Sequence, residues 1–347
     1  MALGSATHGT QDETAATPAS PRGASSGAEK FVRKLLRHGS WAAAELARGR
    51  PRHLVHFYGN TPGDDLMCTA VLHEMRRRGA RGLWMMTRFA ELFVGNPDVD
   101  RVVPFDERYH GLVRVVKGRS WYAHYGGHDE VADQSPIPRQ HILALLCHAC
   151  GITGDVSLRP YLHLTELERN AGRLRPRQIA LHSSGSSAFT SMKNKEWFPD
   201  RFQAVVDTLR DTFDLVQLGS TTDPLLDGCL DLRGKTTRRE SAAIIAASEL
   251  FVGQVGFLMH LARAVNTRAV IIYGGRELPW QSGYSCNTNL VTPLPCSPCW
   301  RWNACHNPIE RDCMRRISVD DVVDAVRTTV LRRGEPLEVE TATVTAG

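Results

Sequence analysis

LFVGQVGFLMHLARAVNTRAVIIYGG, residues 250–275, contains a complete strand–helix–strand unit. We expect an apolar strand over 250–254, a glycine-containing turn, a helix from about Phe257 to Val265 and a second apolar strand over 269–275. Strands joined through a helix in this way run parallel, with a right-handed crossover. The stretch therefore predicts an α/β fold built on a parallel sheet.

The same alternation extends outward on both sides and falls into two halves. Strands are expected at 54–59, 82–87, 99–105, 121–126, 179–185 and 213–220. Helices are expected at 66–79, 139–151 and 200–210, and two more begin with the capping pairs Thr237/Glu240 and Ser318/Asp321. The polar segment 166–177 is interpreted as a linker between a domain over 53–165 and a second over 178–333. Two Rossmann-like domains facing a central cleft are predicted.

The ends of the chain have a different composition. Residues 1–29 are rich in Ala, Ser, Thr and Gly and are predicted to be a disordered tail. Residues 30–52 predict a basic amphipathic lead-in helix, and two interpretations of it stay open: contact with a membrane surface, or packing on the first domain. Residues 334–347 are expected to form a flexible tail.

Charge and composition exclude several classes of protein. The net charge is +5, and residues 1–52 carry eight basic and four acidic side chains, so the rest of the chain is almost neutral. A nucleic-acid-binding protein normally has a basic face on its folded body. The sequence has no signal-peptide h-region and no apolar run of about 20 residues, which predicts a cytoplasmic protein, with the inner membrane face as one further location. Its nine cysteines are expected to be free thiols or metal ligands.

Three segments carry groups suited to chemistry. In NTPGDDLMCT, residues 60–69, Asp64 follows the end of a strand, where it could take a proton from a bound hydroxyl or simply cap its helix. LHSSGSSAFTSMKNKEWFP, residues 181–199, offers hydroxyls and lysines to phosphate oxygens, or else is a mobile surface loop. In residues 250–262 a helix N-terminus follows a glycine turn, and His260 is either a ligand or a core residue.

These segments, in this order, resemble glycosyltransferase family 9, the ADP-heptose:lipopolysaccharide heptosyltransferases of the GT-B fold. The motifs are G-D-x-L-x-x-T, H-x-x-G-S followed by K-x-W-x-P, G-K-T-T, V-G-x-x-x-x-x-M-H-L-A, and C-S-P-C…C…C-M-R-x-I. The resemblance covers about residues 54–330. It implies an inverting enzyme that moves heptose or a related sugar from a nucleotide-diphosphate sugar to a hydroxyl of a cell-surface glycan, lipid-linked or protein acceptor, without a catalytic cofactor.

The resemblance also implies roles for individual residues. Asp64 would be the general base and Lys195 would contact the donor diphosphate, while Gly63 and Asn60 would lie on the acceptor side. The implied donor-binding residues are Lys195, His182, Ser183, Ser184, Gly185, Ser186, Gly234, Lys235, Thr236, Gly253, Gly256, Met259 and His260.

Three departures from the family pattern affect these assignments. Val255 stands where the family has an Asp near the donor sugar, HSSG replaces H-P-G at 182–185, and Phe198 is inserted before Pro199. The lost Asp leaves the identity of the donor open.

The pattern C-x2-C-x5-C-x7-C, formed by Cys296, Cys299, Cys305 and Cys313, matches a structural zinc or iron site, and the resemblance supports this hypothesis. Other interpretations stay open at this point. The chain could be a zinc-ribbon interaction protein, a catalytically inactive scaffold, or another GT-B nucleotide-sugar enzyme such as an epimerase.

Overall fold

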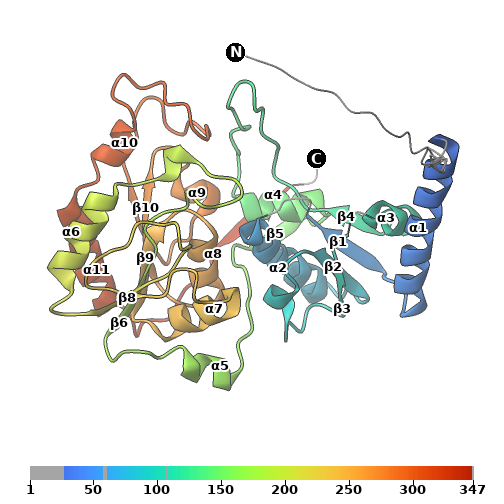
Figure 1. The fold of residues 1–347 in the computed structure, drawn as a ribbon, viewed down its shortest axis with the longest axis horizontal. Helices are drawn as coiled ribbons and strands as arrows, with labels where there is room; N and C mark the ends of the chain where they lie inside the picture. Colours follow the sequence, from blue (N-terminus) through green and yellow to red (C-terminus); the bar gives the residue numbers. More distant parts are fainter. Residues whose placement is uncertain (1–26, 58–60, 107, 117, 346–347) are drawn as a thin grey trace, which may run out of the picture.

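The computed structural model describes residues 27–57, 61–106, 108–116 and 118–345 and has two lobes, each built around a parallel sheet (Figure 1). The strand–helix–strand unit at 250–275 is present as β9 (Leu250–Gln254), α8 (Phe257–Ala264) and β10 (Ala269–Gly274). β9 and β10 pair in parallel. The predicted α/β fold with parallel sheets is therefore confirmed.

The sheet of the first lobe has the strand order β3-β2-β1-β4, with all neighbours parallel. Its apolar side chains alternate between two faces: Val55 and Met85 pack with α2 and α4, whereas Leu54 and Met86 pack toward α1 and α3. The elements of this lobe are α1 (Gly27–Ala47), β1 (His53–His56), α2 (Pro62–Arg77), β2 (Leu83–Thr87), η1 (Ala90–Phe93), β3 (Arg101–Pro104), α3 (Tyr109–Val115), β4 (Ser120–Tyr122), α4 (Ile142–Ala149) and β5 (Gly154–Ser157).

The sheet of the second lobe has the order β11-β10-β9-β6-β7-β8. Helices α7 and α8 cover one face and α6 and α11 cover the other, where Phe202 and Val326 pack on Leu181 and Val252. The remaining elements of this lobe are β6 (Gln178–Leu181), η2 (Lys193–Lys195), α6 (Pro199–Leu209), β7 (Asp214–Gln217), β8 (Leu230–Asp231), α7 (Arg238–Ala247), α9 (Pro279–Ser282), β11 (Thr288–Val291), α10 (Asp312–Arg315) and α11 (Val319–Leu331).

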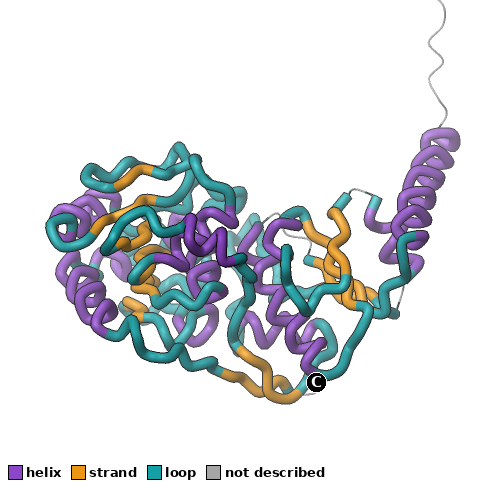
Figure 2. The backbone as a smooth tube through the Cα atoms, turned by 90° about the horizontal axis from the view of Figure 1, so that it is seen from below, coloured by secondary structure: helices purple, strands orange, loops and turns teal. Residues whose placement is uncertain are grey.

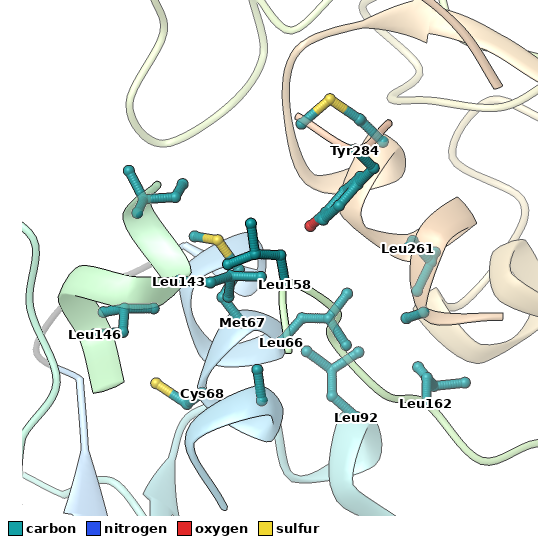
Figure 3. Packing of buried hydrophobic residues seen from close by; sticks show 14 of the residues in the cluster. Leu66, Met67, Cys68, Leu92, Leu143, Leu146, Leu158, Leu162, Leu261 and Tyr284 are labelled. Atoms are coloured by element: carbon teal, nitrogen blue, oxygen red, sulfur yellow. The ribbon is translucent and has the colours of Figure 1, made fainter. Parts of the chain in front are cut away.

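One hydrophobic cluster runs through both lobes and holds them together. Figure 3 shows Leu66 and Met67 of α2 beside Leu143 of α4, with Leu261 of α8 across the lobe boundary. At the start of α2, a Cβ on Gly63 would lie 3.5 Å from the Cα of Phe257. The N-terminal ends of α2 and α8 thus approach each other closely, which brings the candidate residues of both lobes together.

Helix α2 begins four residues before the predicted helix 66–79. Pro62 occupies its first turn, where the missing N–H of proline costs nothing, and Asp64 and Asp65 complement the positive end of the helix dipole. Asp64 therefore lies in the first turn of α2. The two predicted capping boxes, Thr237/Glu240 on α7 and Ser318/Asp321 on α11, are both formed.

The chain ends and the linker differ from expectation. Residues 334–347 were expected to be a flexible tail, but Thr341–Val344 forms β12, which pairs antiparallel with β5 of the first lobe (Figure 2). Val344 is buried there, so its apolar contact fixes the segment. The expected linker 166–177 contains helix α5 (Glu166–Ala171), because Thr165 and Glu168 form a capping box.

The N-terminal helix is one continuous helix, Gly27–Ala47, rather than a segment over 30–52. Residues 27–29 belong to this helix and not to the expected tail, and residues 1–26 lie outside the described part of the chain. Ala42 of α1 packs against the first sheet. Among the described residues, no helix has both the length and the apolar character needed to cross a membrane.

Candidate functional site

A cavity of about 920 Å³ lies between the two lobes. Gly63, Asp64 and Tyr125 of the first lobe border it, and so do Lys195 and His260 of the second. Asp64 and Lys195, which the sequence places more than a hundred residues apart, therefore face one shared space.

Asp64 is held in place from two sides. Tyr125 Oη donates a hydrogen bond to Asp64 Oδ1 at 2.8 Å, and Thr61 Oγ1 donates to Oδ2. Burial raises the pKa of the Asp64 carboxyl, while these two hydrogen bonds and the charge of Lys195 act in the opposite direction. A buried carboxylate with a raised pKa is a stronger proton acceptor than an exposed one once it is ionised.

The neighbouring Asp65 points away from the cavity. Thr87 Oγ1, at the end of β2, donates to its Oδ2. Burial raises the pKa of Asp65 to about 7, and the nearby charge of Asp64 acts in the same direction. Asp65 thus joins α2 to the first sheet, and only Asp64 of the two acidic residues borders the cavity.

Lys195 is the last residue of η2 and forms an ion pair inside the cavity. Its Nζ lies 2.8 Å from Glu277 Oε1, and the Arg276 guanidinium lies 2.8 Å from the same oxygen. Burial lowers the pKa of Lys195, while Glu277 acts to raise it. Burial would raise the pKa of Glu277, but the charges of Lys195 and Arg276 outweigh burial and hold it at about 2.

The serine-rich loop after β6 contributes only part of its predicted residues. His182, Ser184 and Gly185 border the cavity, whereas Ser183 is buried behind it and Ser186 is exposed. Glu196 accepts hydrogen bonds from Gly185 N and Ser184 Oγ, both at 2.8 Å. A carboxylate therefore engages the hydrogen-bond donors that the sequence suggested for phosphate.

The turn between β9 and α8 brings Gly256 and His260 to the cavity. His260 Nδ1 lies 2.6 Å from Tyr284 Oη, and burial together with the charge of Lys195 lowers the pKa of His260 to about 3. His260 is thus a neutral imidazole at neutral pH. Met259 does not border the cavity and contacts Tyr273 Oη through its sulfur.

Gly253 lies inside β9, away from the cavity. A Cβ at this position would lie 2.7 Å from the Phe251 ring and 3.2 Å from the His182 carbonyl oxygen. The absence of a side chain at Gly253 therefore allows the serine-rich loop to pass close to β9. Val255 borders the cavity at the position where the family pattern has Asp.

Of the predicted turn 234–236, only Thr236 borders the cavity. Lys235 Nζ turns away to Asp231, 2.8 Å from its carbonyl oxygen, and Gly234 has a φ of +64° and packs against Thr221. The prediction for Asn60 lies outside the described residues.

Sequence reasoning missed Glu277, Arg276 and Tyr125. Glu277 follows the apolar strand at 269–275, at the carboxyl end of the sheet where ligands gather, so the signal that indicated Asp64 also applied to it. Tyr125 is different, because it follows a short strand and becomes a partner of Asp64 only through the tertiary fold.

The four predicted metal-ligand cysteines border one further cavity of about 280 Å³. Cys305 Sγ accepts a hydrogen bond from the Arg311 backbone N–H at 3.3 Å, and Cys296 Sγ lies 3.7 Å from the Asn307 amide. Within the described ranges, no three His, Cys, Asp or Glu side chains lie close enough together to hold a metal ion. The residue types suit zinc or iron, but their arrangement is not a closed ligand set.

The chain is similar to known glycosyltransferases. Residues 145–308 match the model of glycosyltransferase family 9 (heptosyltransferase). No curated protein matches the sequence. Among solved structures, a family 9 glycosyltransferase from Veillonella parvula has a TM-score of 0.60 and 16% identity, covering 81% of this chain and 97% of its own.

Two structures from E. coli are similar to about the same degree. ADP-heptose lps heptosyltransferase II has a TM-score of 0.59 and 16% identity, over 81% of this chain and 99% of its own. The iron-containing dodecameric glycosyltransferase TibC, from an enterotoxigenic strain, has a TM-score of 0.63 and 15% identity, over 81% of this chain and 76% of its own. The predicted GT-B fold and the resemblance to family 9 are confirmed.

Proposed function

We propose that this chain, a glycosyltransferase with a family 9 domain, transfers heptose or a related sugar from a nucleotide-diphosphate sugar to an acceptor hydroxyl with inversion. One observation carries the proposal: Asp64 of the first lobe and Lys195 of the second border the same cavity. A carboxylate can take a proton from an attacking hydroxyl, and an ammonium can stabilise charge on a departing diphosphate.

Asp64 is proposed as the general base. The acceptor hydroxyl would lie against one of its oxygens and attack the anomeric carbon while its proton passes to the carboxylate. Tyr125 and Thr61 support this role, because their hydrogen bonds fix the direction of the carboxylate in the first turn of α2. Gly63, next to Asp64 in the cavity wall, is proposed to lie on the acceptor side.

The donor is proposed to bind on the second lobe. Lys195 would contact the diphosphate, together with the backbone N–H groups at the start of α8 beside Gly256 and the hydroxyl of Ser184. Glu196 would then give up its hydrogen bonds to Ser184 and Gly185 when phosphate arrives. The TibC structure in complex with ADP-D-beta-D-heptose supports an ADP-linked donor as the first candidate.

Thermal-shift titration with ADP-, GDP-, UDP- and dTDP-sugars tests this function. A ligand at about 100 times its Kd adds roughly 2.7 kcal/mol to the stability of the folded state. We expect one nucleotide series to raise the Tm and to support transfer to an added acceptor. Rearrangement of the donor without an acceptor would instead indicate an epimerase, and binding without turnover would indicate a scaffold.

We also propose that the enzyme works in the cytoplasm and that its acceptor, a glycan, lipid-linked molecule or protein, approaches along the first lobe.

Contact with a membrane through residues 30–52 is a separate proposal, supported by α1, where Val32 and Leu36 are exposed beside Arg33 and Lys34. Co-sedimentation with anionic vesicles tests this contact. Loss of co-sedimentation in the double variant Val32→Ser/Leu36→Ser supports it, and equal co-sedimentation of the two proteins contradicts it.

A structural zinc or iron at Cys296, Cys299, Cys305 and Cys313 is a further proposal. It is supported by the four thiols around one cavity and by the iron in TibC. Metal analysis of the purified protein should find about one metal ion per chain, which Cys299→Ser should remove. Protein that is folded and active but free of metal after growth with both metals would contradict the proposal.

A further inference from the structure

We propose that Glu277 is a positioning residue for the transfer reaction: it holds the Lys195 ammonium in the cavity wall opposite Asp64. This inference rests on the proposed function, because it concerns how the donor-binding lysine is kept ready. The assignment comes from the arrangement of charged groups around Lys195.

Glu277 and Lys195 are joined by a short contact in a nearly closed environment. Glu277 follows β10, and 3% of its side chain is exposed, compared with 21% for Lys195. The single oxygen Oε1 lies 2.8 Å from Lys195 Nζ and 2.8 Å from the Arg276 guanidinium. One carboxylate oxygen therefore lies between two cations.

Arg276, the second cation, is fixed independently of Glu277. Its Nε donates to the Arg301 carbonyl oxygen at 2.9 Å, and its guanidinium lies 4.8 Å from the centroid of the Trp300 ring. Because these contacts hold Arg276 on the segment between Cys299 and Cys305, the guanidinium would stay in place if Glu277 lost its charge. Lys195 would then face a buried arginine without the anion between them.

In this structure, the other two carboxylates that border the cavity within the described chain accept hydrogen bonds from other groups. Asp64 accepts hydrogen bonds from Thr61 and Tyr125, and Glu196 accepts them from Ser184 and Gly185. The turn after β9 has Val255, which carries no charge. Glu277 is thus the carboxylate that contacts Lys195.

The charges around Lys195 determine how its pKa changes when Glu277 is neutralised. The titratable groups facing Lys195 are Glu277 and Arg276 after β10, Asp64 on α2 and His260 on α8. Burial and Arg276 favour the neutral amine, while Glu277 and Asp64 favour the ammonium. Removing the charge of Glu277 should therefore lower the pKa of Lys195 and loosen the position of its Nζ. A neutral lysine binds a diphosphate weakly.

The first experiment measures the charge of Lys195 without any nucleotide. Wild type, Glu277→Gln and Glu277→Asp are labelled briefly with an amine-reactive reagent between pH 7 and 10, and labelling of each lysine is quantified by mass spectrometry. Only neutral amines react, so at pH values below its pKa Lys195 should be labelled roughly ten times faster in Glu277→Gln for each unit by which that pKa falls. Lys193, two residues before Lys195 in the chain, pairs with Glu310 instead and is the internal control.

The second experiment measures the affinity for ADP over the same pH range. Glu277→Gln should lose affinity at a lower pH than wild type, whereas Glu277→Asp, which keeps the charge, should restore part of the difference. Unchanged Lys195 labelling and an unchanged pH profile in a folded Glu277→Gln protein would overturn the inference. If Glu277→Gln does not fold, wild type is compared with Glu277→Asp instead. A smaller shift in Lys195 labelling and in the pH profile of ADP affinity is then expected, and no shift would overturn the inference.

The proposed function and the positioning role of Glu277 would be contradicted by different results. If wild type binds no nucleotide diphosphate while Glu277→Gln still speeds Lys195 labelling, the proposed function is wrong and the positioning of Lys195 stands. If wild type binds ADP and Lys195 labelling is the same in both proteins, the positioning role is wrong and the proposed function stands.

Discussion

Tyr125 Oη donates a hydrogen bond to Asp64 Oδ1 at 2.8 Å, and both residues border the cavity between the lobes. The two side chains come from different elements of the first lobe, Asp64 from the first turn of α2 and Tyr125 from the segment after β4. A hydrogen bond donated to a carboxylate stabilises its ionised form. Tyr125 therefore offsets part of the rise in the pKa of Asp64 that burial causes.

Tyr125→Phe should shift the acid limb of the pH–rate profile to higher pH. Loss of the hydrogen bond raises the pKa of Asp64, so the proposed base becomes protonated, and inactive, at a higher pH than in wild type. The pH dependence of kcat/KM measures this shift. Tyr161→Phe, which changes a tyrosine that packs on His73 elsewhere in the lobe, should leave the limb in place. A limb that stays put or moves to lower pH in Tyr125→Phe would rule out the base assignment.

Gly172→Ala should destabilise the fold. A Cβ on Gly172 would lie 2.1 Å from the Ala243 carbonyl oxygen, where α5 meets α7, although the backbone φ of −73° suits alanine. Overpacking of this kind costs about 1–3 kcal/mol, which urea unfolding can measure. Gly39→Ala, in an exposed part of α1 with no atom within 4 Å of the new Cβ, should leave the midpoint unchanged or raise it. Equal urea midpoints for Gly172→Ala and wild type would show that α5 and α7 move apart at little cost in stability.

Arg239→Ala should weaken the protein most at neutral pH. Arg239 donates to Glu168 at 2.6 and 2.8 Å and to the His163 carbonyl oxygen at 2.7 Å, and its loss should cost about 1–2 kcal/mol. The pair with Arg239 lowers the pKa of Glu168 to about 2. Its contribution is therefore present above the ordinary Glu pKa and is lost as pH falls toward 2.

Urea unfolding at several pH values tests this linkage. The stability difference between wild type and Arg239→Ala should shrink from pH 6 to pH 3. A difference that is constant or grows on acidification would contradict the ion-pair interpretation. Arg48→Ala, whose arginine side chain is 70% exposed and lies 3.6 Å from Glu45, should have almost no effect.

Truncation after Glu340 should loosen β5. The truncated chain lacks β12, so Val156 and its neighbours in β5 lose their antiparallel partner and the buried contact of Val344. Hydrogen–deuterium exchange should become faster over residues 154–157 and stay the same in the central strand β9. Unchanged exchange in β5 would show that β12 does not protect this edge.

The main elements of the fold follow from local patterns in the sequence. β9 is found with its predicted bounds, and α8 and β10 end one residue before theirs, because long apolar runs broken by glycine turns specify buried parallel strands and their helices. The capping boxes at Thr237 and Ser318 also formed as expected, since they depend on residues only three positions apart.

What the sequence could not predict depends on partners far along the chain. β12 is four residues long and exists only because β5, which ends at Ser157, offers it an edge. The Asp64–Tyr125 bond and the Lys195–Glu277 pair likewise join distant segments. Lys235 shows the converse: the motif matches the family, yet the side chain turns to Asp231 instead of the cavity.

In the proposed mechanism Asp64 removes a proton from the acceptor while Lys195 holds the donor, and one paired measurement tests both roles. Donor Kd by calorimetry and single-turnover transfer rate would be compared in wild type, Asp64→Asn and Lys195→Ala. Asn keeps the size of Asp but cannot take the proton, so Asp64→Asn should bind donor normally and transfer about 10²–10⁴ times more slowly. Lys195→Ala should bind the donor weakly. Near wild-type transfer by Asp64→Asn, or unchanged donor affinity in Lys195→Ala, would contradict this mechanism.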